Sequence, residues 1–265
     1  MKIKKSELKK LIENFLLSEE EDKNAEWKSA KDLSPSKKCF DDIFKHESPV
    51  PYVYDDKLAM SEATAYKKYG EIIKTPVIQE IIKKRWPVGK MPYPVTSMQS
   101  LKGRATIGVG HLIEDQSEFE EFKEYTLFNI THDKDGKPID QKQFSSANSS
   151  VSMQDYLMSK EEVFDLFKKD VIEHTQFKDR IKKPITQAMF DSLTSLAFNS
   201  GWEKNRPIQV LINLINQGKY VAAKEKIKTL ATTSGGEQME GIVKRRKEES
   251  ELFGSQGLDP ESKIS

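Results

Sequence analysis

The sequence predicts an α+β fold, with a small lobe that contains a β-hairpin and a mostly helical lobe from residue 158 to 253. The first observation is that two runs, PYVYDD (51–56) and RATIGVGH (104–111), have the composition of β-strands. The second is that the chain after Met158 carries apolar residues at the three- and four-residue spacing of helix faces. Strand-like runs early in the chain and helical spacing later therefore favour two lobes of different kinds.

The composition limits the classes of protein that this chain can belong to. At 265 residues and 36% hydrophobic content it can form one sizeable domain or two small ones. The net charge of +1 argues against a nucleic-acid binder driven by bulk basicity. The single cysteine, Cys39, excludes an internal disulfide and fits synthesis in a reducing cytoplasm. No stretch approaches the roughly 18 apolar residues of a membrane helix or the apolar run of a signal peptide, so we expect neither stable membrane insertion nor ordinary secretion.

Residues 1–38 are predicted to be a charged N-terminal helix followed by a linker. Apolar residues between positions 3 and 16 form a helical stripe on a background rich in lysine and glutamate, and the stretch 19–38 is polar. Two interpretations stay open: a short helix on a tether, or a helix that docks the chain onto a larger assembly.

The main domain is predicted to run from 39 to 254 and to open with a short helix. Phe40, Ile43, Phe44 and Glu47 are spaced at i, i+3, i+4 and i+7, so the glutamate shares the apolar face of that helix. The helix should end at Ser48, because a residue before proline avoids the helical region. The strand PYVYDD then follows.

Two insertions interrupt this domain, at about 57–105 and 114–157. In the first, helical periodicity covers 61–74 and 76–86, and PVGKMPYP (87–94) is predicted to be an irregular loop. The isoleucines of its helices should pack on the small lobe, and its lysines either form a solvated surface or attract an anionic polymer. The second insertion is acidic and contains a turn signal, HDKDGKP (132–138).

The C-terminal part is predicted to be a series of helices. Ser159 and Glu162 have the spacing of a capping box at the start of the first helix, and Gly201 should end the second one. The last helix covers 241–254, and 255–265 is expected to be a disordered tail.

The chemistry-bearing residues point to a pair of carboxylates rather than to a metal or cofactor. The Gly108-Val-Gly110 run lacks the third glycine of a dinucleotide loop, and the histidines and the lone cysteine do not have the spacing of metal ligands. Glu47 lies at the edge of an apolar face, and Asp56 is expected to be more exposed. Two carboxyls in different surroundings are the usual equipment of a glycosidase, although most such pairs in a charged chain are structural.

The stretches FKHESPVPYVYDD (44–56) and ATIGVGHLI (105–113) resemble the phage-type lysozymes of glycoside hydrolase family 24, which include the T-even phage lysozymes. The family signature has a helix that ends in glutamate, a strand with aspartate nine residues later, and then TIGYGH. The matching residues here are Glu47, Tyr54, Asp56, Thr106, Ile107, Gly108, Gly110 and His111. MSKEEVFDLFKKDV, QAMFDSLTSLAFNSG and GIVKRRKEESELF resemble three later family motifs, so the resemblance covers roughly 39–56, 104–113 and 158–253.

The resemblance implies a lysozyme-like fold and a muramidase that cuts the β-1,4 bond between N-acetylmuramic acid and N-acetylglucosamine in bacterial peptidoglycan. Glu47 would be the general acid, and Asp56 with Thr106 would position the attacking water for inversion at the anomeric carbon. The substrate-binding residues would be His111, Asn199, Gly110 and Tyr54, with no metal or cofactor. The enzyme would be made in a host cytoplasm and act at the cell wall, either for lysis or for wall penetration, and residues 1–38 could dock it to a virion or injection device.

The sequence also departs from the family pattern. About fifty residues separate Asp56 from Thr106 where the family has a short turn, and Asp55 beside Asp56 leaves the register open by one residue. We favour Asp56, because neighbouring residues of a strand point to opposite faces and its distance from Glu47 fits the family. Three other functions stay open: a non-catalytic wall-binding component with a lysozyme fold, a lytic transglycosylase, and a bacteriocin with a lysozyme-like killing domain.

Overall fold

A computed structural model describes residues 26–47, 49–69, 76–84, 89–95, 97–126, 157–204, 206–234 and 237–260. The chain divides into two compact units. We call residues 1–46 with 169–265 the helical unit, and residues 47–168 the sheet unit. The described parts of both confirm the α+β class. No described helix is long and apolar enough to cross a membrane.

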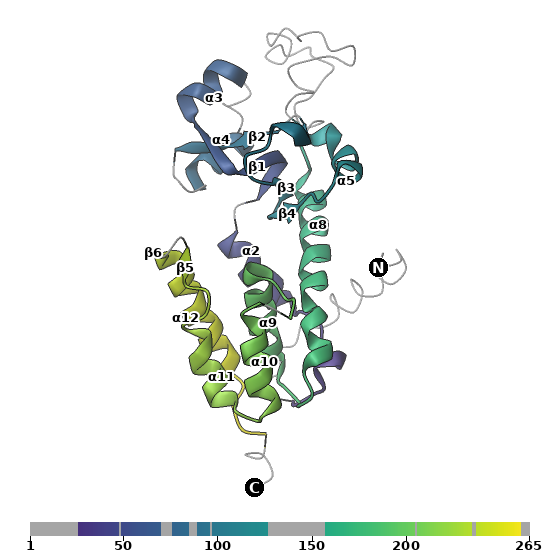
Figure 1. Cartoon of the computed structure of the whole chain (residues 1–265), viewed down its shortest axis with the longest axis vertical. Coiled ribbons are helices and arrows are strands. Elements are labelled where there is room, and N and C mark those ends of the chain that lie inside the picture. The colour runs from purple at the N-terminus through teal and green to yellow at the C-terminus, as the bar shows by residue number, and fades with distance from the viewer. Residues whose placement is uncertain are drawn as a thin grey trace. The chain divides into compact units, whose positions relative to one another are not determined.

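The helical unit is built around one central helix, α9 (Gln187–Ser200), whose residues from Ala188 to Ala197 are all buried. Its sequence is apolar or small on every side, as expected of a helix surrounded by others. The Thr186 side chain caps its first turn by accepting a hydrogen bond from the Met189 N–H, and Gly201 ends it with φ +87°, as predicted. The other elements of this unit are η1 (Ala30–Asp32), α2 (Lys37–His46), η6 (His174–Arg180), α10 (Ile208–Asn216), α11 (Tyr220–Ile227), β5 (Thr233–Ser234), β6 (Glu237–Gln238) and α12 (Glu240–Gly254) (Figure 1).

The prediction of a linker over 19–38 is wrong for the part that the structure describes. Ala30 and Leu33 are buried in the core of the helical unit, and Trp27 packs its edge against Tyr220 with ring centroids 5.0 Å apart. These apolar residues recur every three positions in a polar sequence, so one side of the segment can be buried. Residues 1–25, which include the predicted N-terminal helix, lie outside the described residues.

The predicted disordered tail also begins as packed structure. The Gln256 side chain accepts a hydrogen bond of 3.0 Å from the Ala188 N–H, and Leu258 packs against the core of the helical unit. One apolar side chain and one amide are enough to hold this short segment on the surface of the unit. Residues 261–265 lie outside the described residues.

The sheet unit contains a four-stranded antiparallel sheet in the order β2-β1-β3-β4. Its strands are β1 (Val50–Ser61), β2 (Lys90–Pro94), β3 (Ala105–Gly108) and β4 (His111–Leu112). The two predicted strands are therefore confirmed as parts of β1 and of β3 with β4. The helices of this unit are α3 (Glu62–Tyr69), α4 (Pro76–Lys84), η3 (Met98–Ser100), α5 (Gln116–Glu121) and η4 (Lys123–Tyr125), and α8 (Lys160–Glu173) begins in it.

The first insertion extends this sheet, which the sequence did not predict. Strand β1 continues to Ser61, and the predicted loop 87–94 instead supplies β2. Pro92 and Pro94 lack an N–H group, so they fit only an edge strand, which is the place of β2. The expectation that the isoleucines pack on the small lobe is confirmed for three of them, which share a buried cluster with residues of β1 and β2: Ile78, Ile81 and Ile82.

The second insertion is described up to Thr126. Asp115 caps the first turn of α5, since its side chain accepts a hydrogen bond from the Glu118 N–H. The predicted turn at 132–138 lies outside the described residues. The capping box at the start of α8 is confirmed: the Glu162 N–H donates to Ser159 Oγ at 3.1 Å, and the Ser159 N–H donates to Glu162 Oε2 at 2.7 Å.

Candidate active site

Two of the predicted catalytic residues lie on neighbouring strands of the sheet unit. Tyr54 of β1 is directly opposite Thr106 of β3, and Asp55 is opposite Ala105. The next step of this ladder is the hydrogen bond of 3.1 Å from the Asp56 N–H to the Arg104 carbonyl. Asp56 is therefore offset from Thr106 by only two positions along the β1–β3 ladder, although about fifty residues separate them in the chain.

One peptide backbone connects the two side chains. The Arg104 N–H donates to Asp56 Oδ1 at 2.8 Å, and the Thr106 hydroxyl donates to the Arg104 carbonyl at 3.3 Å. Since the Thr106 hydroxyl donates its hydrogen to that carbonyl, the lone pairs of its oxygen remain to accept a hydrogen bond from another group. Asp56 is exposed, whereas Thr106 is only 2% exposed. An exposed carboxylate beside an oriented hydroxyl can hold and activate a water molecule.

Glu47 lies at the point where the chain leaves the helical unit and enters the sheet unit. It is half-buried and immediately follows α2, whose buried residues are Cys39, Phe40 and Ile43. The predicted apolar face of this helix is confirmed, but the helix ends one residue before the glutamate. The carboxyl separation between Glu47 and Asp56 that inversion requires stays a prediction.

A buried carboxyl of α9 fixes the start of α2. Asp191 accepts hydrogen bonds from the Ser36 N–H at 3.1 Å, the Ser36 hydroxyl at 2.6 Å and the Gln187 amide at 2.8 Å. Ser36 Oγ in turn accepts the Cys39 N–H at 3.1 Å, which caps the first turn of α2. Burial raises the pKa of Asp191 to about 6, although the bonds from Ser36 and Gln187 oppose that shift. Burial also raises the pKa of the Cys39 thiol, so this cysteine is an unreactive core residue.

Gly110 lies in the turn between β3 and β4, and His111 is the first residue of β4. Gly110 has φ +81°, a conformation that favours glycine and makes the tight connection between the two strands possible. His111 Nε2 lies 3.2 Å from Glu118 Oε1, and its ring packs edge-on against Phe122 with centroids 5.4 Å apart. These contacts are those of a structural histidine, and a role of His111 or Gly110 in substrate binding stays a prediction.

The other two predicted substrate-binding residues have different surroundings. Tyr54 is 3% exposed and belongs to the core of the sheet unit, and its predicted role in substrate binding stays a prediction. Asn199 is exposed on α9 in the helical unit, and its side-chain oxygen accepts a hydrogen bond from Arg246. That hydrogen bond fixes the orientation of the Asn199 side chain. A role of Asn199 in substrate binding stays a prediction.

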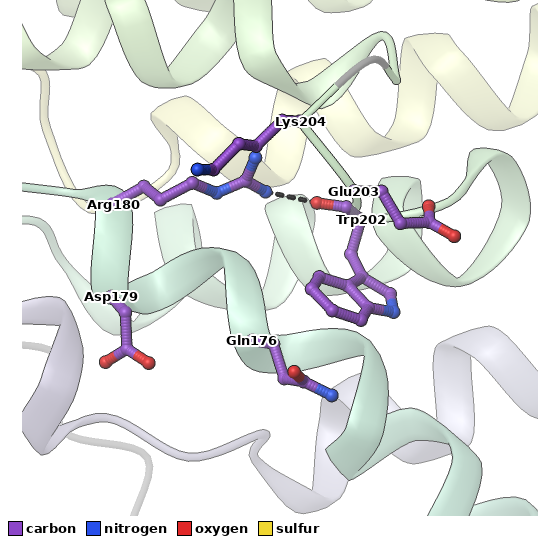
Figure 2. Close-up of a pocket in the computed structure, with 6 residues that line it drawn as sticks. All are labelled: Gln176, Asp179, Arg180, Trp202, Glu203 and Lys204. Carbon is purple, nitrogen blue, oxygen red and sulfur yellow. Dashed lines mark hydrogen bonds between the residues drawn. The ribbon is translucent and has the colours of Figure 1, made fainter.

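A pocket of about 540 Å³ lies in the helical unit, and none of the site residues predicted from the sequence lines it (Figure 2). Figure 2 shows Arg180 donating to the Trp202 carbonyl across one wall of it. A second Arg180 bond, of 2.8 Å, goes to the Gln209 side chain. The residues lining the pocket are Gln176, Asp179, Arg180, Trp202, Glu203 and Lys204. Sequence reasoning missed it, since these residues form no motif.

Part of the chain is similar in sequence to a phage endolysin. The chain is 35% identical over 99 residues to the endolysin of Bacillus phage B103. The match covers 37% of this chain and 36% of that protein, so it spans little more than a third of the length of either.

Three solved structures resemble the fold at low sequence identity. The endolysin from Escherichia coli O157:H7 phage FAHEc1 is 18% identical, with 84% of this chain and 94% of that chain covered and a TM-score of 0.45. The muramidase domain of SpmX from Asticaccaulis excentricus is 16% identical, with coverages of 83% and 97% and a TM-score of 0.44. A point mutant of P22 lysozyme is 16% identical, with coverages of 83% and 98% and a TM-score of 0.45.

The family comparison covers a larger part of the chain. The phage lysozyme family matches residues 93–249, which is more than half of the sequence. The match contains Thr106, the helices from α8 to α11 and the first ten residues of α12, whereas Glu47 and Asp56 precede it. A match of this length shows that the chain belongs to the phage lysozyme family.

Proposed function

We propose that this protein is a muramidase that hydrolyses the β-1,4 bond between N-acetylmuramic acid and N-acetylglucosamine in bacterial peptidoglycan. Membership of the phage lysozyme family supports this activity, as does the similarity to a phage endolysin. The observation that carries the proposed mechanism is the Arg104 peptide, which holds the Asp56 carboxylate with its N–H and the Thr106 hydroxyl with its carbonyl.

In the proposed mechanism, Glu47 gives its proton to the leaving glycosidic oxygen. Asp56 accepts one proton from a water molecule on the opposite face of the sugar. The Thr106 oxygen accepts a hydrogen bond from the other O–H of that water, which stays on the oxygen as it attacks. The bond to the leaving oxygen breaks as the water oxygen attacks the anomeric carbon, which inverts its configuration. A carboxyl separation of roughly 6.5–9.5 Å leaves room for this water, and about 5 Å would make Asp56 a covalent nucleophile instead.

The test of the proposed site compares two pairs of variants. Glu47→Gln and Asp56→Asn should fold normally and lose lytic activity on purified peptidoglycan by at least about 100-fold, because each removes a proton-transfer group. The matched controls are Glu251→Gln and Asp165→Asn, which change exposed carboxyls on α12 and α8 and should keep wild-type activity. Normal lysis by Glu47→Gln or Asp56→Asn would show that the proposed site is wrong.

The proposed setting is the bacterial cell wall, reached either during host lysis or during wall penetration by a phage or phage-like particle. Synthesis in a host cytoplasm is part of this proposal and fits the single cysteine, and docking to a virion or injection device would use residues 1–38. Deleting residues 1–25 tests the docking role: loss of particle association with unchanged lysis by the free enzyme is the expected result, and unchanged association would refute it.

A further inference from the structure

Asp55, which precedes the proposed catalytic Asp56, has a buried carboxylate whose two oxygens both accept hydrogen bonds. Asp55 is 1% exposed. Its Oδ1 accepts hydrogen bonds from the backbone N–H groups of Lys57 at 2.9 Å and Gly103 at 3.0 Å. Its Oδ2 accepts from the N–H groups of Lys102 at 2.6 Å and Gly103 at 3.2 Å. We call this set of bonds the Asp55 clasp.

The clasp joins the two ends of the first insertion. Lys57 is the first residue after Asp56, and Lys102 and Gly103 come just before β3, so one carboxylate closes a segment of more than forty residues at its base. Burial tends to raise the pKa of Asp55, but the N–H bonds from Lys102, Lys57 and Gly103 outweigh it and lower the pKa. The clasp therefore holds the ionised carboxylate.

The same segment of backbone also lies against Asp56. A Cβ atom added to Gly103 would be 1.9 Å from Asp56 Oδ1 and 2.7 Å from Asp55 Oδ1, so the backbone at Gly103 runs close to both carboxylates. Three consecutive N–H groups are shared between two consecutive aspartates: those of Lys102 and Gly103 go to Asp55, and that of Arg104 goes to Asp56. Any movement of Gly103 therefore moves the Arg104 peptide.

We propose that Asp55 is a positioning residue, which holds the 102–104 backbone so that the Arg104 peptide orients Asp56 and Thr106 for attack by water. Gly103 is also required for this arrangement, because only a residue without a side chain lets the backbone approach the carboxylates of both Asp55 and Asp56. The inference rests on the proposed function, since it assigns the role of Asp55 through Asp56.

The clasp changes what we expect of Asp55→Asn, which on strand alternation alone would have only a mild effect. Asparagine has one acceptor oxygen and an NH₂ group, so in either orientation its NH₂ must face N–H groups that now donate to the carboxylate. The 102–104 segment would be released, and Asp56 would lose its fixed partner. Misplacement of a catalytic group by about 1 Å can cost on the order of 100-fold in rate.

The test measures kcat and apparent KM on purified peptidoglycan for the single variants Asp55→Asn, Gly103→Ala and Asp56→Asn. It also measures them for two double variants, in which Asp56→Asn is combined with Asp55→Asn or with Gly103→Ala. Asp55→Asn and Gly103→Ala should each lower kcat at least about 10-fold and leave the apparent KM within about two-fold, because sugar binding is retained while the water is misplaced. In the Asp56→Asn background each should lower kcat much less than it does in the wild-type background, because both act largely through Asp56. The matched control is Asp115→Asn, which changes another carboxylate that accepts a backbone N–H in the sheet unit and should keep wild-type kinetics.

Three results would overturn the inference. The first is full activity of a folded Asp55→Asn variant. The second is that Asp55→Asn lowers kcat by the same factor in the Asp56→Asn background as in the wild-type background, which would indicate a general structural role. If Asp55→Asn does not fold, Gly103→Ala decides in the same way, and its full activity refutes the clasp. An inactive Asp56→Asn with a fully active Asp55→Asn refutes this inference alone, whereas a fully active Asp56→Asn refutes the proposed site as well.

Discussion

Replacing Asp191 with asparagine should remove a pH dependence from the stability of the helical unit. Burial raises the pKa of this carboxyl to about 6, whereas an unfolded chain has the ordinary value of 3.8. The folded state therefore binds more protons than the unfolded state between these two values. The contribution of Asp191 to stability is complete below about pH 4 and is lost as the pH rises through 6.

The magnitude follows from the difference of about two pKa units. At about 1.4 kcal/mol per unit, ionisation of Asp191 costs the folded state roughly 3 kcal/mol, of which roughly 2 kcal/mol falls between pH 4.5 and 7.5. Asparagine keeps an acceptor for the Ser36 N–H and the Gln187 amide, and its NH₂ can donate to Ser36 Oγ. The free energy of unfolding of Asp191→Asn minus that of wild type should thus increase by roughly 2 kcal/mol over this range.

The assay is guanidinium unfolding at several pH values, followed by tryptophan fluorescence. Trp27 and Trp202 both pack against the core that contains α9, so two of the three tryptophans of the chain report on this unit. Taking the difference between variant and wild type cancels the titration of the other carboxyls. A difference that stays constant within about 0.5 kcal/mol from pH 4.5 to 7.5, or one that decreases, would refute the reasoning.

Two other changes test the packing of the helical unit and the role of the first insertion. Glu249 is buried and accepts hydrogen bonds from Ser195, Arg245 and Arg246. Glu249→Gln should therefore lower the free energy of unfolding by roughly 3–5 kcal/mol, measured against the exposed control Glu251→Gln on the same helix. A loss below about 1 kcal/mol would contradict this. Changing the insertion lysines Lys67, Lys68, Lys83 and Lys84 to glutamine should weaken binding to purified cell walls mainly at low ionic strength and leave the melting temperature almost unchanged. Equal binding of variant and wild type across the salt range would leave the insertion as a solvated elaboration.

Local patterns in the sequence were enough to predict several elements. The capping box of Ser159 and Glu162, the stop at Gly201 and the apolar face of α2 each depend on residues within one or two helical turns. Such features require no knowledge of the rest of the fold, and the structure confirms all three.

The predictions that failed depend on contacts between distant parts of the chain. The segment with Pro92 and Pro94 forms a strand only because β1 continues beyond Asp56 and offers it an edge. Trp27 packs because Tyr220 lies beside it, nearly two hundred residues later in the chain. Neither partner can be found from local periodicity.

The candidate site shows the same division. Strand alternation correctly placed Asp55 and Asp56 in different surroundings, one buried and one exposed. It could not show that the Asp55 carboxylate binds the N–H groups of Lys102 and Gly103, because the insertion hides their proximity. Tyr54 was assigned to substrate binding by resemblance, and the sequence pattern alone did not show that it belongs to the core cluster of the sheet unit.

The central claim is inverting hydrolysis at muramic acid, and the most direct measurement is the structure of the first product. Purified peptidoglycan is digested with the full chain, the soluble fragments are identified by mass spectrometry, and the anomer formed first is followed by NMR. The account predicts fragments with reducing N-acetylmuramic acid ends that appear first in the α configuration. Anhydro-muramic ends would indicate a lytic transglycosylase, a β-configured first product would make Asp56 a nucleophile, and the absence of any released fragment would indicate a wall-binding protein; each of these results would contradict the account.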